Sequence, residues 1–238
     1  MKSIFFSFLI ITPFFMIAQN SHEKIIYLIP GQGSDERLFK NISINHYETR
    51  AIKYEIPEKG ATMATYAQQL SAQIDTSLSY SLIGVSLGGM LAMEMAKQLN
   101  PDEVILIASA KNRNEIPRLY KFFRKFPLHL LFGGNFYKFW TLALQPLYEP
   151  MPKEDQRMWR DMMKQKNPKF MRRAVRCIIE WENEDSAGEN VLHIHGTKDK
   201  TLPIKNIEEP VIVEDGTHVM TLTKGEEISA IINQWLSK

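Results

Sequence analysis

Cysteine, net charge and long apolar runs are all scarce in this sequence. A single Cys among 238 residues cannot form an internal disulfide, which excludes a disulfide framework and a cysteine-rich metal site. The net charge of +2 gives no reason to expect a nucleic acid partner. The longest apolar run covers about 15 residues, whereas a membrane-spanning helix needs about 20. What remains is the composition of a globular protein, with 44% hydrophobic and 24% charged residues.

That longest apolar run lies at the start of the chain and has the pattern of a secretory signal peptide. Lys2 supplies a short positive region, residues 4–18 are almost entirely apolar, and polar residues follow. We therefore expect residues 1–18 to be removed and the protein to be secreted or delivered to the periplasm. The alternative is that the segment stays in place as an uncleaved membrane anchor.

From residue 24 onward, short apolar runs alternate with amphipathic stretches. The runs predicted as strands are 24–30, 48–56, 80–86, 102–110, 190–196 and 210–216. The stretches predicted as helices are 62–74, 87–99 and 224–236. This alternation, with strands that are apolar on both faces, predicts an α/β fold with a mostly parallel sheet and helices on both faces.

Residues 111–185 interrupt this alternation and are predicted to form several helices. They are rich in aromatic residues and methionine. Trp140, Trp159 and Trp181 are expected to be mainly core, and the alternative is that they line an acyl pocket. Residues 110–180 contain 16 Lys and Arg against 6 Asp and Glu, a net charge of +10 that the rest of the chain offsets. We therefore expect an inserted helical segment at 111–185, between two parts of one core domain at 24–110 and 186–238.

The motif GVSLGG places Ser86 between a predicted strand and a predicted helix. A nucleophile at such a join needs a sharp turn, and Gly84 and Gly88 supply the small residues that the turn requires. The backbone N–H of Leu87 would then lie at the start of the helix, where unpaired donors favour a developing oxyanion. The alternative is a glycine-rich helix start with Ser86 as a simple cap.

Two further polar residues follow predicted strands. Asp199 comes after the strand at 190–196, and His218 comes after the strand at 210–216. Because parallel strands end at one edge of a sheet, both are expected beside Ser86, where they could hold and activate a serine hydroxyl. Asp215 and Glu115 are weaker candidates for the acid.

With these motifs, the chain resembles the α/β-hydrolase superfamily from about Lys24 to the C-terminus, as a serine hydrolase with a helical cap. The resemblance implies that Ser86 is the nucleophile, Asp199 the acid and His218 the general base. It also implies a second oxyanion donor in the loop IPGQGSD, namely the backbone N–H of Gln32. The string PGQGS is similar as well to the oxyanion loop of malonyl-type acyltransferases.

These features predict a hydrolase that cleaves a small-molecule carboxylic ester or thioester through an acyl-enzyme, with no metal and no organic cofactor. The net positive segment at 111–185 is a candidate for peripheral contact with a membrane. One alternative is a non-hydrolytic member of the same fold, such as a lyase, cofactor-free oxygenase, perhydrolase or acyltransferase. Another is a ligand-binding protein without turnover.

Three other residues that often carry chemistry are expected to be structural here. His193 and His195 alternate along one predicted strand, and without a carboxylate at ligand spacing they favour packing over a metal site. Cys177 lies at helical spacing with Ala174 and Ile178, which predicts a small residue facing the core.

Overall fold

The computed structural model describes residues 24–185 and 188–238, so the expected signal peptide lies outside the described residues. The described chain contains a six-stranded sheet in the order β2-β1-β3-β4-β5-β6, with every neighbouring pair parallel. The strands are β1 (Ile25–Ile29), β2 (Glu48–Ala51), β3 (Tyr80–Val85), β4 (Val104–Ile107), β5 (Val191–Gly196) and β6 (Val211–Val213). The predicted parallel sheet is confirmed, although most strands are shorter than their apolar runs.

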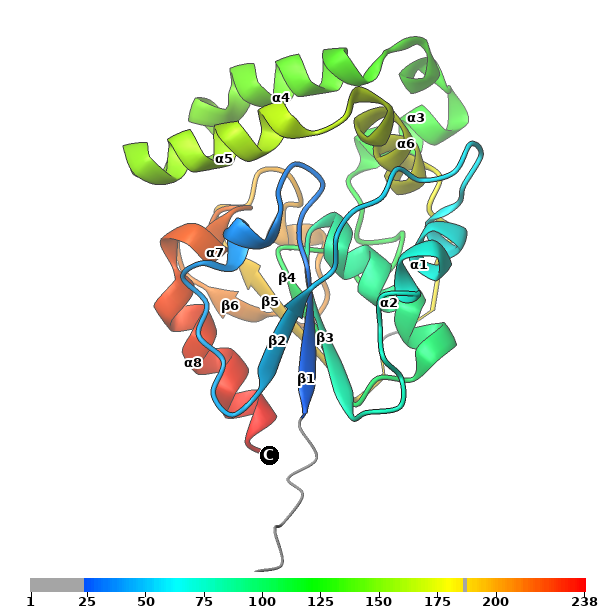
Figure 1. Ribbon diagram of the computed structural model, residues 1–238. Helices are drawn as coiled ribbons and strands as arrows, with labels where there is room; N and C mark the ends of the chain where they lie inside the picture. The colour runs from blue at the N-terminus through cyan, green and yellow to red at the C-terminus, as the bar shows by residue number, and fades with distance from the viewer. Residues whose placement is uncertain (1–23, 186–187) are drawn as a thin grey trace, which may run out of the picture.

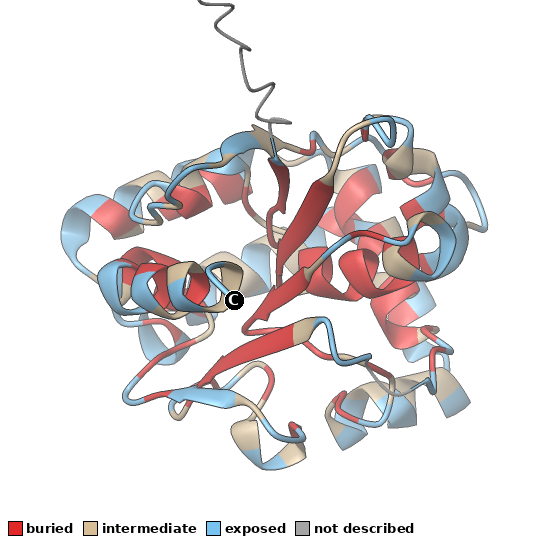
Figure 2. Cartoon of the chain, turned by 90° about the horizontal axis from the view of Figure 1, so that it is seen from below, coloured by how far each residue is buried: buried red, intermediate tan, exposed pale blue. Residues whose placement is uncertain are grey.

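Helices cover both faces of this sheet (Figure 1). They are α1 (Met63–Ser71) and α2 (Leu87–Leu99) on one face, with α7 (Met220–Thr223), α8 (Gly225–Leu236) and the short 3-10 helix η1 (Glu36–Phe39) on the other. Thr62 begins α1 with a capping box that it forms with Thr65, as its position before the apolar pattern predicts. Seen from below, the buried strands lie between the helices (Figure 2), so apolar residues on both faces of the strands form the core.

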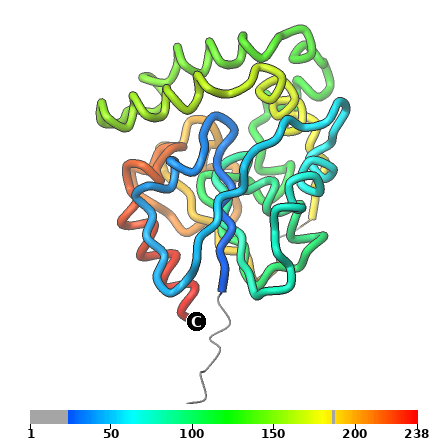
Figure 3. Tube along the Cα trace, viewed as in Figure 1, coloured from blue at the N-terminus to red at the C-terminus, as the bar shows by residue number. Residues whose placement is uncertain are grey.

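The segment between β4 and β5, which we call the cap segment (residues 111–185), is helical. It contains α3 (Arg118–Lys125), the 3-10 helix η2 (Leu128–Leu131), α4 (Gly134–Tyr148), α5 (Lys153–Gln165) and α6 (Pro168–Ile179). Figure 1 shows α4 and α5 lying across the end of the sheet at which the strands finish. The chain leaves the sheet after β4 and returns to it at β5 (Figure 3), so the cap segment covers the edge where polar loops meet.

The strand order fixes where a site can form. In the sheet, β2 lies on one side of β1, and β3 lies on its other side. The loop after β1 therefore runs toward one edge of the sheet, and the loop after β3 runs toward the opposite edge. A crevice forms at the carboxyl ends of strands where the order reverses in this way. Within the described residues, no helix is both long and apolar enough to cross a bilayer.

Candidate active site

Ser86 lies in the turn that joins β3 to α2, in a backbone conformation that serine rarely adopts. Its φ is 54° and its ψ is −120°, outside the common regions for residues with a side chain. Such a conformation costs about 1–3 kcal/mol and persists only where the surroundings enforce it. The strain holds the hydroxyl of Ser86 clear of the strand, at the end of the sheet that the cap segment covers.

Gly84 and Gly88 make this turn sterically feasible. A Cβ at Gly84 would lie 2.3 Å from the carbonyl oxygen of Gly88, and a Cβ at Gly88 would lie 2.0 Å from that of Ile29. Both obstacles are backbone atoms, which cannot rotate away as a side chain can. The helix can therefore begin directly behind Ser86 only because both positions are glycine, as the motif predicts.

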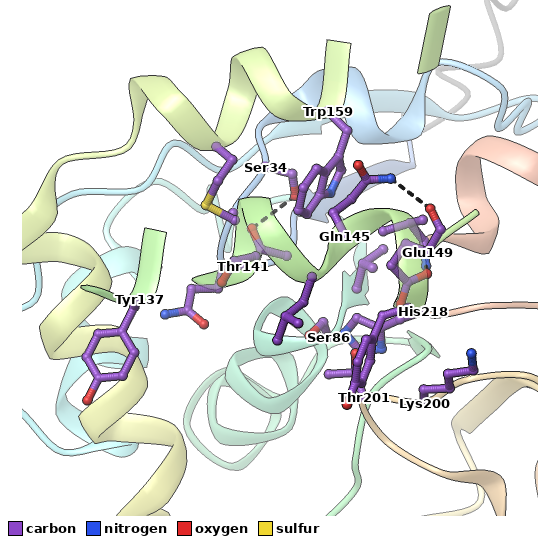
Figure 4. Close-up of a pocket in the computed structure, with 18 of the residues that line it drawn as sticks. Ser34, Ser86, Tyr137, Thr141, Gln145, Glu149, Trp159, Lys200, Thr201 and His218 are labelled. Atoms are coloured by element: carbon purple, nitrogen blue, oxygen red, sulfur yellow. Dashed lines mark hydrogen bonds between the residues drawn. The ribbon is translucent and has the colours of Figure 1, made fainter. Parts of the chain in front are cut away.

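The loops after β5 and β6 bring Asp199 and His218 to Ser86. Nδ1 of His218 donates to Oδ2 of Asp199 at 2.7 Å, and the hydroxyl of Ser86 lies 2.8 Å from Nε2 of His218. Because the carboxylate only accepts hydrogen bonds, it fixes the ring proton on Nδ1 and leaves Nε2 free to accept the serine proton. Three residues separated by up to 132 positions thus form one continuous hydrogen-bonded series, with Ser86 and His218 at the base of the cavity in Figure 4.

Further contacts hold Asp199 in its charged form. Burial alone would raise the pKa of this carboxyl, but the charge of His218 and hydrogen bonds from His195 and His218 hold it well below its usual range. The backbone N–H groups of Thr201 and Leu202 donate to its other oxygen at 2.8 and 2.7 Å. Asp199 is therefore a fixed negative charge beneath the histidine.

The same carboxylate sets the basicity of His218. Burial alone would lower the pKa of the imidazole. The charge of Asp199, the hydrogen bond to it and the charge of Glu149 act in the opposite direction and raise the pKa above its ordinary value of 6.5. A raised pKa makes Nε2 a better acceptor for the proton of Ser86.

The other acid candidates lie elsewhere. The carboxylate of Asp215 is exposed and pairs with Nζ of Lys198 at 2.9 Å. Glu115 is buried, and its carboxylate accepts from the backbone N–H groups of Lys111 and Glu208. Neither is hydrogen-bonded to His218, so the structure brings only Asp199 of the three to the histidine.

His193 and His195 are buried, and His195 lies next to Asp199. Nε2 of His195 faces two acceptors, the carbonyl of Leu202 at 2.7 Å and Oδ2 of Asp199 at 3.4 Å, so it carries the proton. Burial, His195 and Lys111 lower the pKa of His193 to about 3, which keeps its ring neutral. These contacts give both histidines a structural role, in line with the sequence prediction.

Two backbone donors in the loops beside Ser86 have no acceptor among the described residues. None of the hydrogen bonds among the described residues uses the N–H of Leu87, the first residue of α2, or the N–H of Gln32 in the loop after β1. The side-chain amide of Gln32 donates instead to the carbonyl of Met171 in α6 at 3.2 Å, which ties the loop to the cap segment. Both N–H groups thus remain available to an acceptor.

A cavity of about 470 Å³ opens above Ser86 and His218, between the sheet and the cap segment (Figure 4). Apolar side chains supply most of its wall, among them Leu119, Tyr137, Trp140, Leu144, Trp159 and Met163. A volume in this range accommodates a small organic molecule. Of the three tryptophans, Trp181 is buried in the core, Trp159 is buried and also lines the cavity, and Trp140, which is 46% exposed, follows the alternative and lines the cavity.

Sequence reasoning missed Glu149, which follows α4 and reaches the histidine loop. Its Oε2 accepts from the backbone N–H of Val219 at 3.3 Å, and its Oε1 is buried with no hydrogen-bond partner among the described residues. Burial raises the pKa of this carboxyl, although the charge of His218 acts against that rise. Nothing in the local sequence marks Glu149, because its contacts lie about 70 residues away in the chain.

The comparison with known families decides the assignment. A model described as the alpha/beta hydrolase family matches residues 7–231. The chain belongs to the alpha/beta hydrolase family. The resemblance and the fold class predicted from the sequence are thereby confirmed, while no curated protein matches the sequence of this hydrolase.

Solved structures of the same fold are similar to this hydrolase over most of their length. The esterase EaEST from Exiguobacterium antarcticum matches with a TM-score of 0.66 at 13% identity, over 90% of this chain and 92% of its own. MenH from S. aureus matches with a TM-score of 0.67 at 16% identity, over 91% and 94%. A hydrolase from Pseudomonas aeruginosa PA01 matches with a TM-score of 0.68 at 12% identity, over 92% of this chain and 91% of its own. At these identities the likeness shows the fold alone.

Proposed function

We propose that this chain is an exported serine hydrolase that cleaves a carboxylic ester or thioester of a small molecule through an acyl-enzyme. The observation that carries the proposal is the hydrogen-bonded series from Asp199 through His218 to Ser86, which ends at an apolar cavity. A strained serine beside a base that is itself held by a buried carboxylate is the arrangement that acyl transfer requires.

In the first half of the reaction, Oγ of Ser86 attacks the substrate carbonyl carbon while Nε2 of His218 takes the hydroxyl proton. The imidazolium that results is stabilised by the negative charge of Asp199, which itself stays deprotonated. His218 then returns the proton to the departing alcohol or thiol. In the second half, Nε2 of His218 takes a proton from a water molecule that attacks the acyl carbonyl carbon. His218 then returns this proton to Oγ of Ser86 as the bond to the acyl group breaks, and the carboxylic acid leaves.

The N–H groups of Leu87 and Gln32 supply the charge stabilisation in both halves. Attack on the carbonyl turns its oxygen into an oxyanion, and donors that are already oriented stabilise this charge without reorganising. The N–H of Leu87 adds the positive end of the α2 dipole. This chemistry needs neither a metal nor an organic cofactor, because the protein's own groups carry each proton and each charge.

The walls of the cavity favour an apolar acyl or aromatic group on the substrate. Trp140, Leu144 and Trp159 of the cap segment contribute apolar surface above the serine. In this proposal the core at 24–110 and 186–238 supplies the reacting groups, and the cap segment selects the substrate. The apolar pattern of residues 4–18 supports export to the periplasm or the medium.

The proposal is tested with matched series of p-nitrophenyl esters and acyl thioesters of increasing chain length. We expect hydrolysis by the native chain, and a loss of about 10⁴-fold or more in kcat for Ser86→Ala. Equal turnover by Ser86→Ala would rule out the serine as nucleophile. Binding of these compounds without release of product would instead favour a binding protein or a non-hydrolytic member of the family.

A further inference from the structure

The cap segment carries most of the exposed apolar surface of the molecule. Of the 16 large hydrophobic side chains that are exposed among the described residues, 13 lie between Leu119 and Tyr148. The most exposed include Leu131 at 78%, Leu147 at 65% and Phe139 at 63%. Exposed apolar side chains gathered in one segment in this way mark a place where something else binds.

Several of these exposed residues belong to helix α4, and their exposure follows from the way this helix is oriented. Its exposed residues Phe136, Phe139, Trp140, Leu144 and Leu147 recur at helical spacing and form one apolar face. A surface helix of a globular protein ordinarily turns such a face inward. Here Phe136, Phe139 and Leu147 are exposed to solvent, while Trp140 and Leu144, at the edge of the same face, also line the cavity.

The polar side of α4 makes the contacts with the rest of the cap segment. Nζ of Lys138 donates to the carbonyl oxygens of Lys164 and Lys166 at the end of α5, at 2.6 and 2.7 Å. The amide of Gln145 is buried, and its oxygen accepts from Gln156 of α5 at 3.0 Å. These specific contacts fix the helix so that Phe136, Phe139 and Leu147 stay exposed.

The apolar surface continues from α4 to its neighbours. The rings of Phe132 and Phe136 stack with centroids 4.1 Å apart, which joins the end of η2 to α4. Leu119 of α3 and Leu144 of α4 are exposed and also line the same cavity. In Figure 1, α3 and α4 lie at the end of the molecule opposite the C-terminus, and these two residues connect the exposed apolar surface there to the cavity.

The charged side chains around this surface indicate which kind of partner covers it. Residues 118–148 contain five Lys and Arg and no Asp or Glu. Arg124 pairs with Glu182, but Arg118, Lys121 and Lys125 form no ion pair with any carboxylate of the described chain. A second copy bound symmetrically would place these cations against their own equivalents, which opposes self-association.

We propose that the face formed by α3, η2 and α4 docks on a bilayer that contains anionic lipid. Its Phe, Leu and Trp side chains enter the boundary between headgroups and acyl chains, and Arg118, Lys121 and Lys125 contact the lipid phosphates. In this orientation the mouth of the cavity faces the bilayer. One further step rests on the proposed function. The substrate would be an apolar ester that enters the cavity from the lipid without crossing water.

The test places an environment-sensitive fluorophore on the docking face. A nitrobenzoxadiazole dye is attached to Leu131→Cys, and as a control to Ile212→Cys on β6, an exposed apolar position away from the cap segment. The native Cys177 does not compete, because it is buried and burial raises the pKa of its thiol to about 12. Both proteins carry Ser86→Ala, so the result does not depend on turnover.

With vesicles of phosphatidylcholine and phosphatidylglycerol, we expect a blue shift and a rise in emission at position 131 and no change at position 212. The shift should be much smaller with pure phosphatidylcholine and should weaken in high salt. Adding Lys121→Glu and Lys125→Glu should raise the lipid concentration at half-saturation at least tenfold, whereas the control Lys205→Glu should not change it.

Three results would overturn the proposal. The first is no shift at position 131 with anionic vesicles, even if the chain sediments with them, because another segment would then make the contact. The second is an equal shift with neutral vesicles, which would remove the role of the cations. The third is a dimer in sedimentation velocity without lipid that Leu131→Ser with Phe139→Ser converts to a monomer, because a second copy would then cover the face.

Discussion

His218 stands between a strained serine and a buried carboxylate, and its protonation controls the proposed chemistry. Its Nε2 can accept the proton of Ser86 only when the ring is neutral, whereas Asp199 and Glu149 both stabilise the charged ring. The same charges that make His218 a strong base therefore also narrow the pH range in which it is free to act. Asp199 and Glu149 therefore set both the basicity of His218 and the pH range in which it can accept a proton.

The identity of the acid can be tested by substituting each candidate. Asp199→Asn removes the charge that stabilises the imidazolium and allows the wrong ring tautomer, so we expect kcat to fall by about 10⁴-fold. Asp215→Asn, at an exposed carboxylate that pairs with Lys198, should leave kcat within about twofold. Loss of activity in Asp215→Asn with retention in Asp199→Asn would show that the acid has been assigned wrongly.

Glu149 should tune the pH dependence of the enzyme. Its charge raises the pKa of His218, so Glu149→Gln should lower that pKa and move the acidic limb of kcat/KM to lower pH. The glutamine oxygen can still accept from the N–H of Val219, which preserves the loop. The profile is measured from pH 4 to 9 with a neutral ester.

The control for this substitution is Glu154→Gln on the exposed side of α5, which should leave the limb where it is. A limb that moves to higher pH in Glu149→Gln, or that moves equally in both variants, would contradict a charge effect of Glu149 on the histidine.

At the scale of elements, the junction of β3 and α2 depends on glycine. A Cβ at Gly88 would lie 2.0 Å from the backbone oxygen of Ile29 in β1, so Gly88→Ala must displace either the helix or the strand. We expect it to lower the free energy of unfolding by about 3 kcal/mol, measured by urea denaturation. Gly133→Ala, where no atom lies within 4 Å, should change it by less than about 0.5 kcal/mol. Equal effects in the two variants would contradict this account of the turn.

The elements of the core could be predicted from the sequence because each carries its own periodicity. β3 and α2 follow directly from an apolar run and from the helical spacing behind Ser86. The position of Asp199 and His218 beside Ser86 also follows, since parallel strands end at one edge of the sheet. These predictions needed only local pattern and general topology.

The arrangement of the cap segment could not be predicted in the same way. The spacing of Phe136 and Phe139 indicates a helix, but the usual rule would turn such residues inward, whereas the structure exposes both. The rule fails because Lys138 and Gln145 hold the polar side of α4 to α5, a contact between distant residues. Glu149 was missed for the same reason, since its role depends on a loop that lies far along the chain.

At the scale of the whole molecule, the small net charge hides a separation of charge between two parts. Residues 110–180 carry a net charge of +10, and the rest of the chain offsets it. Ser86, Asp199 and His218 belong to the offsetting part, whereas most of the apolar cavity wall and the exposed face belong to the positive part. In the proposed function, chemistry and recognition therefore belong to different segments of one chain.

Export is a prediction for the chain as a whole. We expect the mature protein to begin near Gln19 or Asn20 and to be recovered outside the cytoplasm, because residues 4–18 suit recognition and removal as a signal peptide. The N-terminus is determined by mass spectrometry after expression of the full chain. A chain without residues 2–18 should stay in the cytoplasm, and an intact Met1 in the membrane fraction would indicate an anchor instead.

The most direct measurement is covalent labelling of the native chain with a fluorophosphonate, read by intact mass and peptide mapping. We predict one adduct per chain, located on Ser86, and none in Ser86→Ala. Ser34→Ala is the matched control, because Ser34 lines the same cavity but donates its hydroxyl to the carbonyl of Gly31, and it should be labelled like the native chain. An unlabelled native chain, or equal labelling of Ser86→Ala, would contradict the assignment of Ser86 as the nucleophile.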